Sequence, residues 1–266
     1  PQRIPGLACV LTVLRRSQRK CCMRLDRFIS NLARFNRKDA RQLLASGRLQ
    51  VDGQIVRDGH LQIREFNRVE LDHEVLQAGK PARFYMLHKP TGYVSATVHP
   101  QHLTVLDLLD VPDKHELHLA GRLDLNTSGL LLITNDGHWS RQLTLPGSHL
   151  PKAYRVRTEH PITAEYADVF ARGLYFAYED LTTLPAELQI LAAHEARLTL
   201  HEGRYHQVKR MFGYFRNRVI DLHRESIGAL HLGELPCGAW RTLTVQEVRQ
   251  LQPQPPTASA VERSTD

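Results

Sequence analysis

The chain has 266 residues, 42% of them hydrophobic and 24% charged, a balance typical of a globular protein with one large domain and a small one. No apolar run is long enough to cross a bilayer, and the 15 histidines show no His-Glu-x-x-His spacing, so neither a membrane span nor a metal site is indicated. Residues 1–65 contain 14 Lys and Arg against 5 Asp and Glu, and the rest contains 21 against 23, so the net charge of +7 is concentrated near the N-terminus and favours a polyanionic partner such as nucleic acid.

The first 23 residues differ from the rest of the chain. An apolar segment, residues 7–14, precedes the Arg-rich residues 15–20, which reverses the order found in a secretory signal. A transit peptide would also be rich in arginine and free of acids, but we interpret residues 1–23 as an extension upstream of a start at Met23, not native or disordered. The four cysteines form no Cys-x-x-Cys pair, which indicates reduced thiols in a cytoplasmic protein.

A small domain is predicted over residues 24–66. Apolar residues recur at helical spacing from Leu25 to Leu32, which predicts a first helix. Asn36 is expected to cap a second helix that ends at Gly47. Asp52-Gly53 then lies between two short strand-like segments, a strong hairpin signal. Residues 67–82 are predicted to contain a short strand and a linker.

Seven basic side chains are spread over these two helices and the hairpin. The unit resembles the S4 RNA-binding domain, including the Gly-Arg-Leu-x-Val-Asp-Gly pattern at residues 47–53. The resemblance implies that the seven side chains contact phosphates, which would position RNA without reading its sequence. An ordinary helical unit with a solvated basic surface is the alternative. The seven residues are Arg24, Arg27, Arg34, Arg37, Lys38, Arg41 and Arg48.

A larger domain is predicted over residues 83–251, followed by a Pro-rich, disordered tail at 252–266. Its strands outnumber its helices and arrive in runs without βαβ alternation, which favours an α+β fold with a mainly antiparallel sheet. Strands are expected near residues 84–89, 130–133, 152–156, 188–190, 197–200, 219–224 and 240–243. Helices are expected near residues 104–109 and 161–173 and after Gly203.

The most informative segment of this domain runs from Gly121 to Gly129. The apolar residues 130–133 that follow it predict a buried strand, which places Asp124 in a polar turn at the edge of a rigid element. An acidic residue in a turn more often has a capping role than a functional one. A calcium loop is excluded because its twelfth position is Asn135 where a Glu is required, and a phosphate-binding Gly-x-x-x-x-Gly-Lys pattern is absent.

This segment, Gly-Arg-Leu-Asp-x-x-Thr-x-Gly-Leu-Leu, closely resembles the catalytic signature of the pseudouridine synthases that modify ribosomal RNA. The resemblance extends from Arg24 to about Val248. It implies isomerisation of a uridine that has been extruded from the RNA stack, a reaction that needs no cofactor. Asp124 would be the catalytic carboxylate. Tyr154, in Lys-Ala-Tyr, would stack on the base and help to remove the C5 proton, and Lys209 would keep Asp124 ionised.

The same resemblance assigns further residues to substrate binding. Leu222 would form an apolar wall of the pocket, Arg122 would lie beside the flipped nucleotide, and His206 and Gln207 belong to the motif that carries Lys209. The structural alternatives are that Arg122 binds carbonyl groups of its own turn, that Leu222 and Tyr154 are part of the core, and that Lys209 is a solvated helix residue.

Within the family, residues 203–212 and 179–182 resemble most closely the RsuA type, which acts on the small ribosomal subunit. Relatives that act on the large subunit tend to carry Arg at position 209 and a long basic C-terminal extension. The predicted partner is therefore 16S ribosomal RNA, naked or in an assembling subunit, and the protein is expected to be a monomer. The alternatives are a 23S RNA pseudouridine synthase and a non-catalytic, RNA-binding assembly factor.

Overall fold

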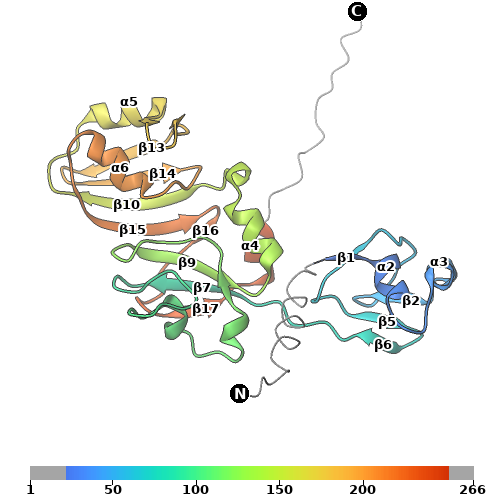
Figure 1. Cartoon of the computed structure of the whole chain (residues 1–266). Coiled ribbons are helices and arrows are strands. Elements are labelled where there is room, and N and C mark those ends of the chain that lie inside the picture. Colours follow the sequence, from blue (N-terminus) through green and yellow to red (C-terminus); the bar gives the residue numbers. More distant parts are fainter. Residues whose placement is uncertain (1–21, 252–266) are drawn as a thin grey trace, which may run out of the picture. The chain divides into compact units, whose positions relative to one another are not determined.

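The computed structural model describes residues 22–251, and the chain divides into two compact units between Ala82 and Arg83 (Figure 1). Apart from Cys22 and Met23, the predicted N-terminal extension lies outside the described residues, as does the predicted tail at 252–266. No helix within residues 22–251 has the length and apolar character needed to cross a membrane.

The first unit packs two helices against short strands. As predicted, the side chain of Asn36 caps the second helix by accepting hydrogen bonds from the backbone N–H groups of Lys38 and Asp39, and Gly47 ends this helix with φ at 70°. The elements are β1 (Met23–Arg24), α2 (Leu25–Ser30), α3 (Arg37–Ser46), β2 (Leu49–Val51), β3 (Gln54–Ile55), β4 (Gln62–Ile63), β5 (Val69–Leu71) and β6 (Glu74–Gln77).

Residues 67–82 are more structured than the prediction of a strand and a linker. Strands β5 and β6 both belong to the first unit, whose four-stranded sheet has the order β3-β2-β5-β6. Val69 and Leu71 point into the core formed with Leu25, Ile29 and Leu49. The apolar alternation of β5 covers only three residues, Val69 to Leu71, and is too short to predict a two-stranded segment. Its pairing with β2 stabilises the strand.

The second unit is built on a nine-stranded sheet with the order β13-β14-β10-β15-β9-β7-β17, to which β8 and β16 add at the sides. Its strands are β7 (Phe84–Lys89), β8 (His118–Leu119), β9 (Ser128–Thr134), β10 (Lys152–Thr158), β13 (Glu187–Ala192), β14 (Glu195–Leu200), β15 (Val219–Ile227), β16 (Leu230–His231) and β17 (Trp240–Thr242). A separate hairpin pairs β11 (Tyr175–Phe176) with β12 (Leu181–Thr182).

The predicted α+β class with a mainly antiparallel sheet is confirmed. Among the strand pairs of the large sheet, β9 and β15 are parallel, with Arg224 opposite Gly129. Gly129 has φ at 113°, and a Cβ atom there would lie 2.3 Å from the carbonyl oxygen of Arg224. The glycine of the motif is therefore required by a close backbone approach between the strand that follows Asp124 and β15.

Helices cover parts of the sheet. Phe170 on α5 (Ala164–Arg172) and Phe212 on α6 (Gln207–Tyr214) are fully buried against a core that includes Tyr154, and Figure 1 shows both helices beside β13 and β14. The predicted segment near 104–109 is a 3-10 helix, Val105–Leu108.

Two helices were not predicted, α4 (Gly137–Thr144) and α7 (Val245–Gln250). The Asn-Asp-Gly sequence at residues 135–137 begins α4, because the Asp136 side chain accepts hydrogen bonds from the backbone N–H groups of His138 and Trp139.

Candidate active site

A cavity of about 870 Å³ opens in the second unit beside the predicted catalytic segment. Its lining comes from the loop at 120–125, from β10, from the loop at 201–206 and from β15. Asp124, Tyr154, Arg122 and His206 all line this cavity. Residues selected from three separate parts of the sequence therefore meet around one cavity.

Asp124 is held between two basic groups. The Nζ atom of Lys209 donates a hydrogen bond to Asp124 Oδ2 over 3.1 Å, and the Nε2 atom of His206 lies 3.2 Å from Oδ1. About a third of the Asp124 side chain is exposed, so a ligand in the cavity can reach it. The carboxylate that sequence analysis selected thus faces its predicted basic partner and a second basic group, each on a different oxygen.

The loop that carries Asp124 is fixed by side chains bound to its backbone. The Nζ atom of Lys89, a fully buried residue, donates hydrogen bonds to the carbonyl oxygen of Thr127 over 2.8 Å and to that of Pro90 over 2.9 Å. Ser95 Oγ donates to the carbonyl oxygen of Leu123 over 2.6 Å and accepts from its backbone N–H. Burial lowers the pKa of the Lys89 ammonium to about 8, although the charge of Asp124 opposes this shift.

Arg224 on β15 is a second buried cation beside the cavity. Its Nε atom donates to the carbonyl oxygen of Leu130 over 2.8 Å, and its Nη1 atom lies 3.5 Å from both the Arg122 carbonyl oxygen and the Tyr154 hydroxyl. Within the described residues, Nη2 has no hydrogen-bond partner. Nearby Lys152 also lines the cavity, and burial together with the charge of Arg224 lowers its pKa to about 8. Both cations make this side of the cavity electropositive.

Two of the residues predicted to bind substrate have other surroundings. The buried amide of Gln207 donates to Glu202 and accepts from the backbone N–H of Arg204, so it holds the neighbouring loop and does not line the cavity. Leu222 is buried beneath the site, in the same core cluster as Tyr154. Exposed Arg122 lines the cavity, and its contact with the flipped nucleotide stays a prediction.

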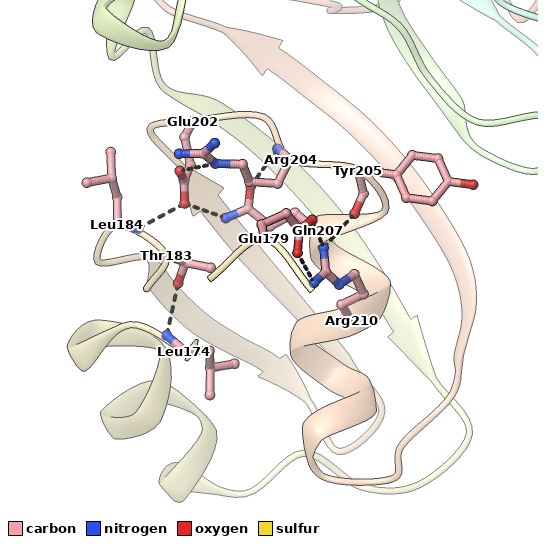
Figure 2. A network of polar contacts seen from close by, with 9 residues as sticks. All are labelled: Leu174, Glu179, Thr183, Leu184, Glu202, Arg204, Tyr205, Gln207 and Arg210. Carbon is pink, nitrogen blue, oxygen red and sulfur yellow. Dashed lines mark hydrogen bonds and ion pairs between the residues drawn. The ribbon is translucent and has the colours of Figure 1, made fainter. Parts of the chain in front are cut away.

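The loop before α6 is braced by a polar network, which Figure 2 shows. Glu202 is buried and accepts hydrogen bonds from Gln207, from the Arg204 side chain and from the backbone N–H of Leu184. Arg210 on α6 forms two hydrogen bonds with the carboxylate of Glu179, and its guanidinium lies 3.6 Å from the centre of the Phe176 ring. These contacts join the β11–β12 hairpin, the loop and α6 into one structure.

In the first unit, four of the seven predicted RNA-binding residues surround a hollow of about 210 Å³: Arg24, Arg27, Arg37 and Arg41. Lys38 is exposed on α3. Arg34 forms an ion pair with Glu74 over 2.8 Å and lies over the ring of Phe35, while Arg48 pairs with Asp72. Arg24 is likewise paired with Asp26, which also lines the hollow, over 2.6 Å. Arg27, Arg37 and Arg41 around the hollow are therefore the best candidates for phosphate contacts.

Sequence analysis missed Lys89, Ser95, Lys152 and Arg224. A signal for Arg224 exists, because β15 places it on the same face as buried Leu222, two residues earlier, where an apolar residue is expected. Lys89 follows Tyr85 and Leu87 on one face of β7 in the same way. No group of three or more His, Cys, Asp or Glu side chains suited to hold a metal ion occurs in the described part of the chain.

The comparisons with known proteins agree with this fold. A family model described as RNA pseudouridylate synthase matches residues 83–214, and a model of the S4 domain matches residues 23–69. The chain is 61% identical over 227 residues to "Ribosomal small subunit pseudouridine synthase A" of Pseudomonas aeruginosa, covering 85% of this chain and 99% of the relative. The protein of the same name from Escherichia coli is 43% identical over 227 residues, 85% of this chain and 98% of that relative.

A solved structure titled "Crystal structure of pseudouridylate synthase" is also similar, with a TM-score of 0.62 and 37% identity over 86% of this chain and 99% of that one. A chain that joins an S4 domain to a synthase domain, with an acidic residue at a cavity of about 870 Å³, defines the class as an RNA-modifying enzyme. The chain belongs to the RNA pseudouridylate synthase family, and it resembles the members named for the small ribosomal subunit.

Proposed function

We propose that this pseudouridine synthase converts one uridine of 16S ribosomal RNA to pseudouridine, with Asp124 as its catalytic carboxylate. The observation that carries the proposal is the position of Asp124, which lies at a cavity of about 870 Å³ with each carboxylate oxygen facing a basic group. The choice of the small subunit rests on the names of relatives that share 61% and 43% of their aligned residues with this chain.

In the proposed reaction, the Asp124 carboxylate attacks C1′ of the flipped nucleotide or assists departure of the base, and the electron pair of the N1–C1′ bond leaves with the uracil. The uracil turns within the cavity, and C5 forms the new bond to C1′. Where Asp124 has bonded to C1′, this step breaks the O–C1′ bond and releases the carboxylate with its electron pair. C5 loses a proton and N1 gains one, so the product is an isomer of the substrate. Tyr154 lines the cavity and is the proposed group that stacks on the base and relays the C5 proton.

The remaining roles follow from contacts. The Lys209 ammonium, 3.1 Å from Asp124, would keep the carboxylate ionised, and His206 would orient its other oxygen. Arg122 at the rim would contact the phosphate backbone beside the flipped nucleotide. The first unit would dock the RNA through the arginines around its hollow. We further propose a cytoplasmic monomer, because ribosomal RNA is the substrate and one chain supplies every proposed group.

The test is pseudouridine mapping of 16S and 23S RNA from a strain that lacks this protein, complemented with wild type, Asp124→Asn or Asp110→Asn. Asp110 is an exposed acid that does not line the cavity, so its variant controls for loss of a carboxylate elsewhere. The proposal expects one 16S pseudouridine to disappear and to return with wild type and Asp110→Asn but not with Asp124→Asn. A pseudouridine lost from 23S RNA would instead indicate a large-subunit enzyme, and an unchanged map would favour a non-catalytic RNA-binding protein.

A further inference from the structure

Tyr205 is an exposed aromatic residue at the rim of the cavity, and the catalytic roles proposed above do not use it. It lines the cavity, yet 75% of its surface is accessible to solvent. One face of its ring stacks on the imidazole of His206, with ring centres 3.9 Å apart and planes inclined by 23°. Because this contact covers one face, the exposed surface of Tyr205 includes the opposite face of the ring.

The two stacked rings contact the proposed catalytic carboxylate through His206. His206 lies against Tyr205 on one side, and its Nε2 atom is 3.2 Å from Asp124 Oδ1. The backbone of His206 adopts a left-handed conformation, with φ at 49° and ψ at 31°, which is unusual for a residue with a side chain. This conformation places two consecutive rings in contact at the start of α6.

The loop that presents Tyr205 is held from behind. Its carbonyl oxygen accepts a hydrogen bond from Arg210 over 3.4 Å, and Arg210 is fixed in turn by Glu179. On the other side of Tyr205, the buried Glu202 and Gln207 hold the backbone of Arg204. In Figure 2 the Tyr205 ring extends away from this network, while its backbone belongs to it. A surface ring on a fixed backbone loses little conformational entropy when a planar ligand binds.

We propose that Tyr205 is a stacking platform for the base adjacent to the target uridine, so that the flipped nucleotide enters the cavity while its neighbour is held at the rim. Every base has a π face, and stacking on an exposed aromatic ring is worth roughly a tenfold change in affinity or more. Exposed Arg122, on the same rim, would supply charge for the connecting phosphate. This inference rests on the proposed function, since it assumes an extruded uridine.

The variants are Tyr205→Ala, which removes the ring, and Tyr205→Phe, which keeps it. Tyr178, 96% exposed on the β11–β12 hairpin and not part of the cavity lining, provides the matched control Tyr178→Ala. Each full-length protein is assayed on an RNA stem-loop that contains the uridine identified by mapping. Tyr205→Ala is expected to raise Kd and KM about tenfold, with the single-turnover rate at saturating RNA within about twofold of wild type, whereas Tyr205→Phe and Tyr178→Ala match wild type.

A spectroscopic readout separates stacking from a structural effect. With 2-aminopurine placed next to the target uridine, on its 5′ or its 3′ side, one of the two complexes with wild type should fluoresce less than the complex with Tyr205→Ala, because stacking quenches the probe. The proposal is overturned if Tyr205→Ala binds as wild type does, if Tyr178→Ala loses as much affinity, or if the loss appears in the saturating rate alone. If wild type itself forms no pseudouridine, the proposed function fails instead.

Discussion

The close approach of Gly129 to β15 allows a quantitative test of how the proposed site is assembled. In Gly129→Ala, the new Cβ atom would lie 2.3 Å from the Arg224 carbonyl oxygen and 2.4 Å from its backbone nitrogen, whereas ordinary contacts begin near 3.4 Å. Strands β9 and β15 would therefore have to separate by about 1 Å, which breaks the parallel pairing that places Arg224 beside the cavity.

The matched control is Gly121→Ala. Gly121 has φ at 99°, so both alanines carry a similar penalty for a left-handed backbone, but the nearest atom to its Cβ would be a methyl carbon of Thr144 at 3.9 Å. Gly121→Ala is expected to cost about 1–2 kcal/mol, and Gly129→Ala about 1–3 kcal/mol more because of overpacking. Urea unfolding measures both costs. Equal destabilisation of the two variants would refute the close-contact explanation, as would full activity of Gly129→Ala in the folded state.

Three further outcomes are expected. Lys209→Met should lower kcat about 100-fold, because Asp124 loses the charged donor that orients it, and Lys209→Arg should restore most of this loss; single-turnover kinetics measure both. The pKa of Lys89 is lowered to about 8 from 10.5, so between these pH values the unfolded chain binds more protons than the folded one. The free energy of unfolding of wild type, relative to that of Lys89→Met, should therefore rise as the pH increases from about 8 to 10.5, as urea titrations would measure. Removing Arg27 and Arg37 together should weaken RNA binding and reduce its salt dependence by up to about two counterions in filter-binding assays.

The order of the elements could largely be predicted from sequence because their local signals are strong. Asn36 and Gly47 bound α3 as predicted, and Asp52-Gly53 forms the hairpin with φ values of 52° and 78°. The errors occur where tertiary contacts decide the outcome. Strand β5 consists of three residues, and its pairing with β2 is a contact between segments about 20 residues apart, which local periodicity does not reveal.

The candidate site, like the fold, could be predicted from the sequence only in part. Asp124, Tyr154 and Lys209 were selected through a family motif, and the structure gathers them at one cavity or in direct contact with a residue that lines it. Gln207 belongs to the same motif as Lys209, but its side chain is turned into the polar network by the helix that begins there. A linear pattern identifies both residues equally, and only the direction in which α6 presents each side chain distinguishes them.

Two of the residues that sequence analysis missed share one physical property, since Lys89 and Arg224 are cations in inward-facing strand positions. Burying a charge is costly unless it is hydrogen-bonded. Here Lys89 Nζ binds a carbonyl oxygen of the loop that carries Asp124 and Arg224 Nε binds one of the strand that follows it, while Arg224 Nη2 has no partner within the described residues. A peptide carbonyl bound in this way cannot move without leaving a buried cation unsatisfied. Buried Lys89 and Arg224 therefore restrict the movement of the backbone around Asp124. They also place positive charge beside the cavity that a polyanionic substrate would enter. No local pattern encodes this arrangement, because the two cations come from β7 and β15, which lie on opposite sides of β9 in the sheet.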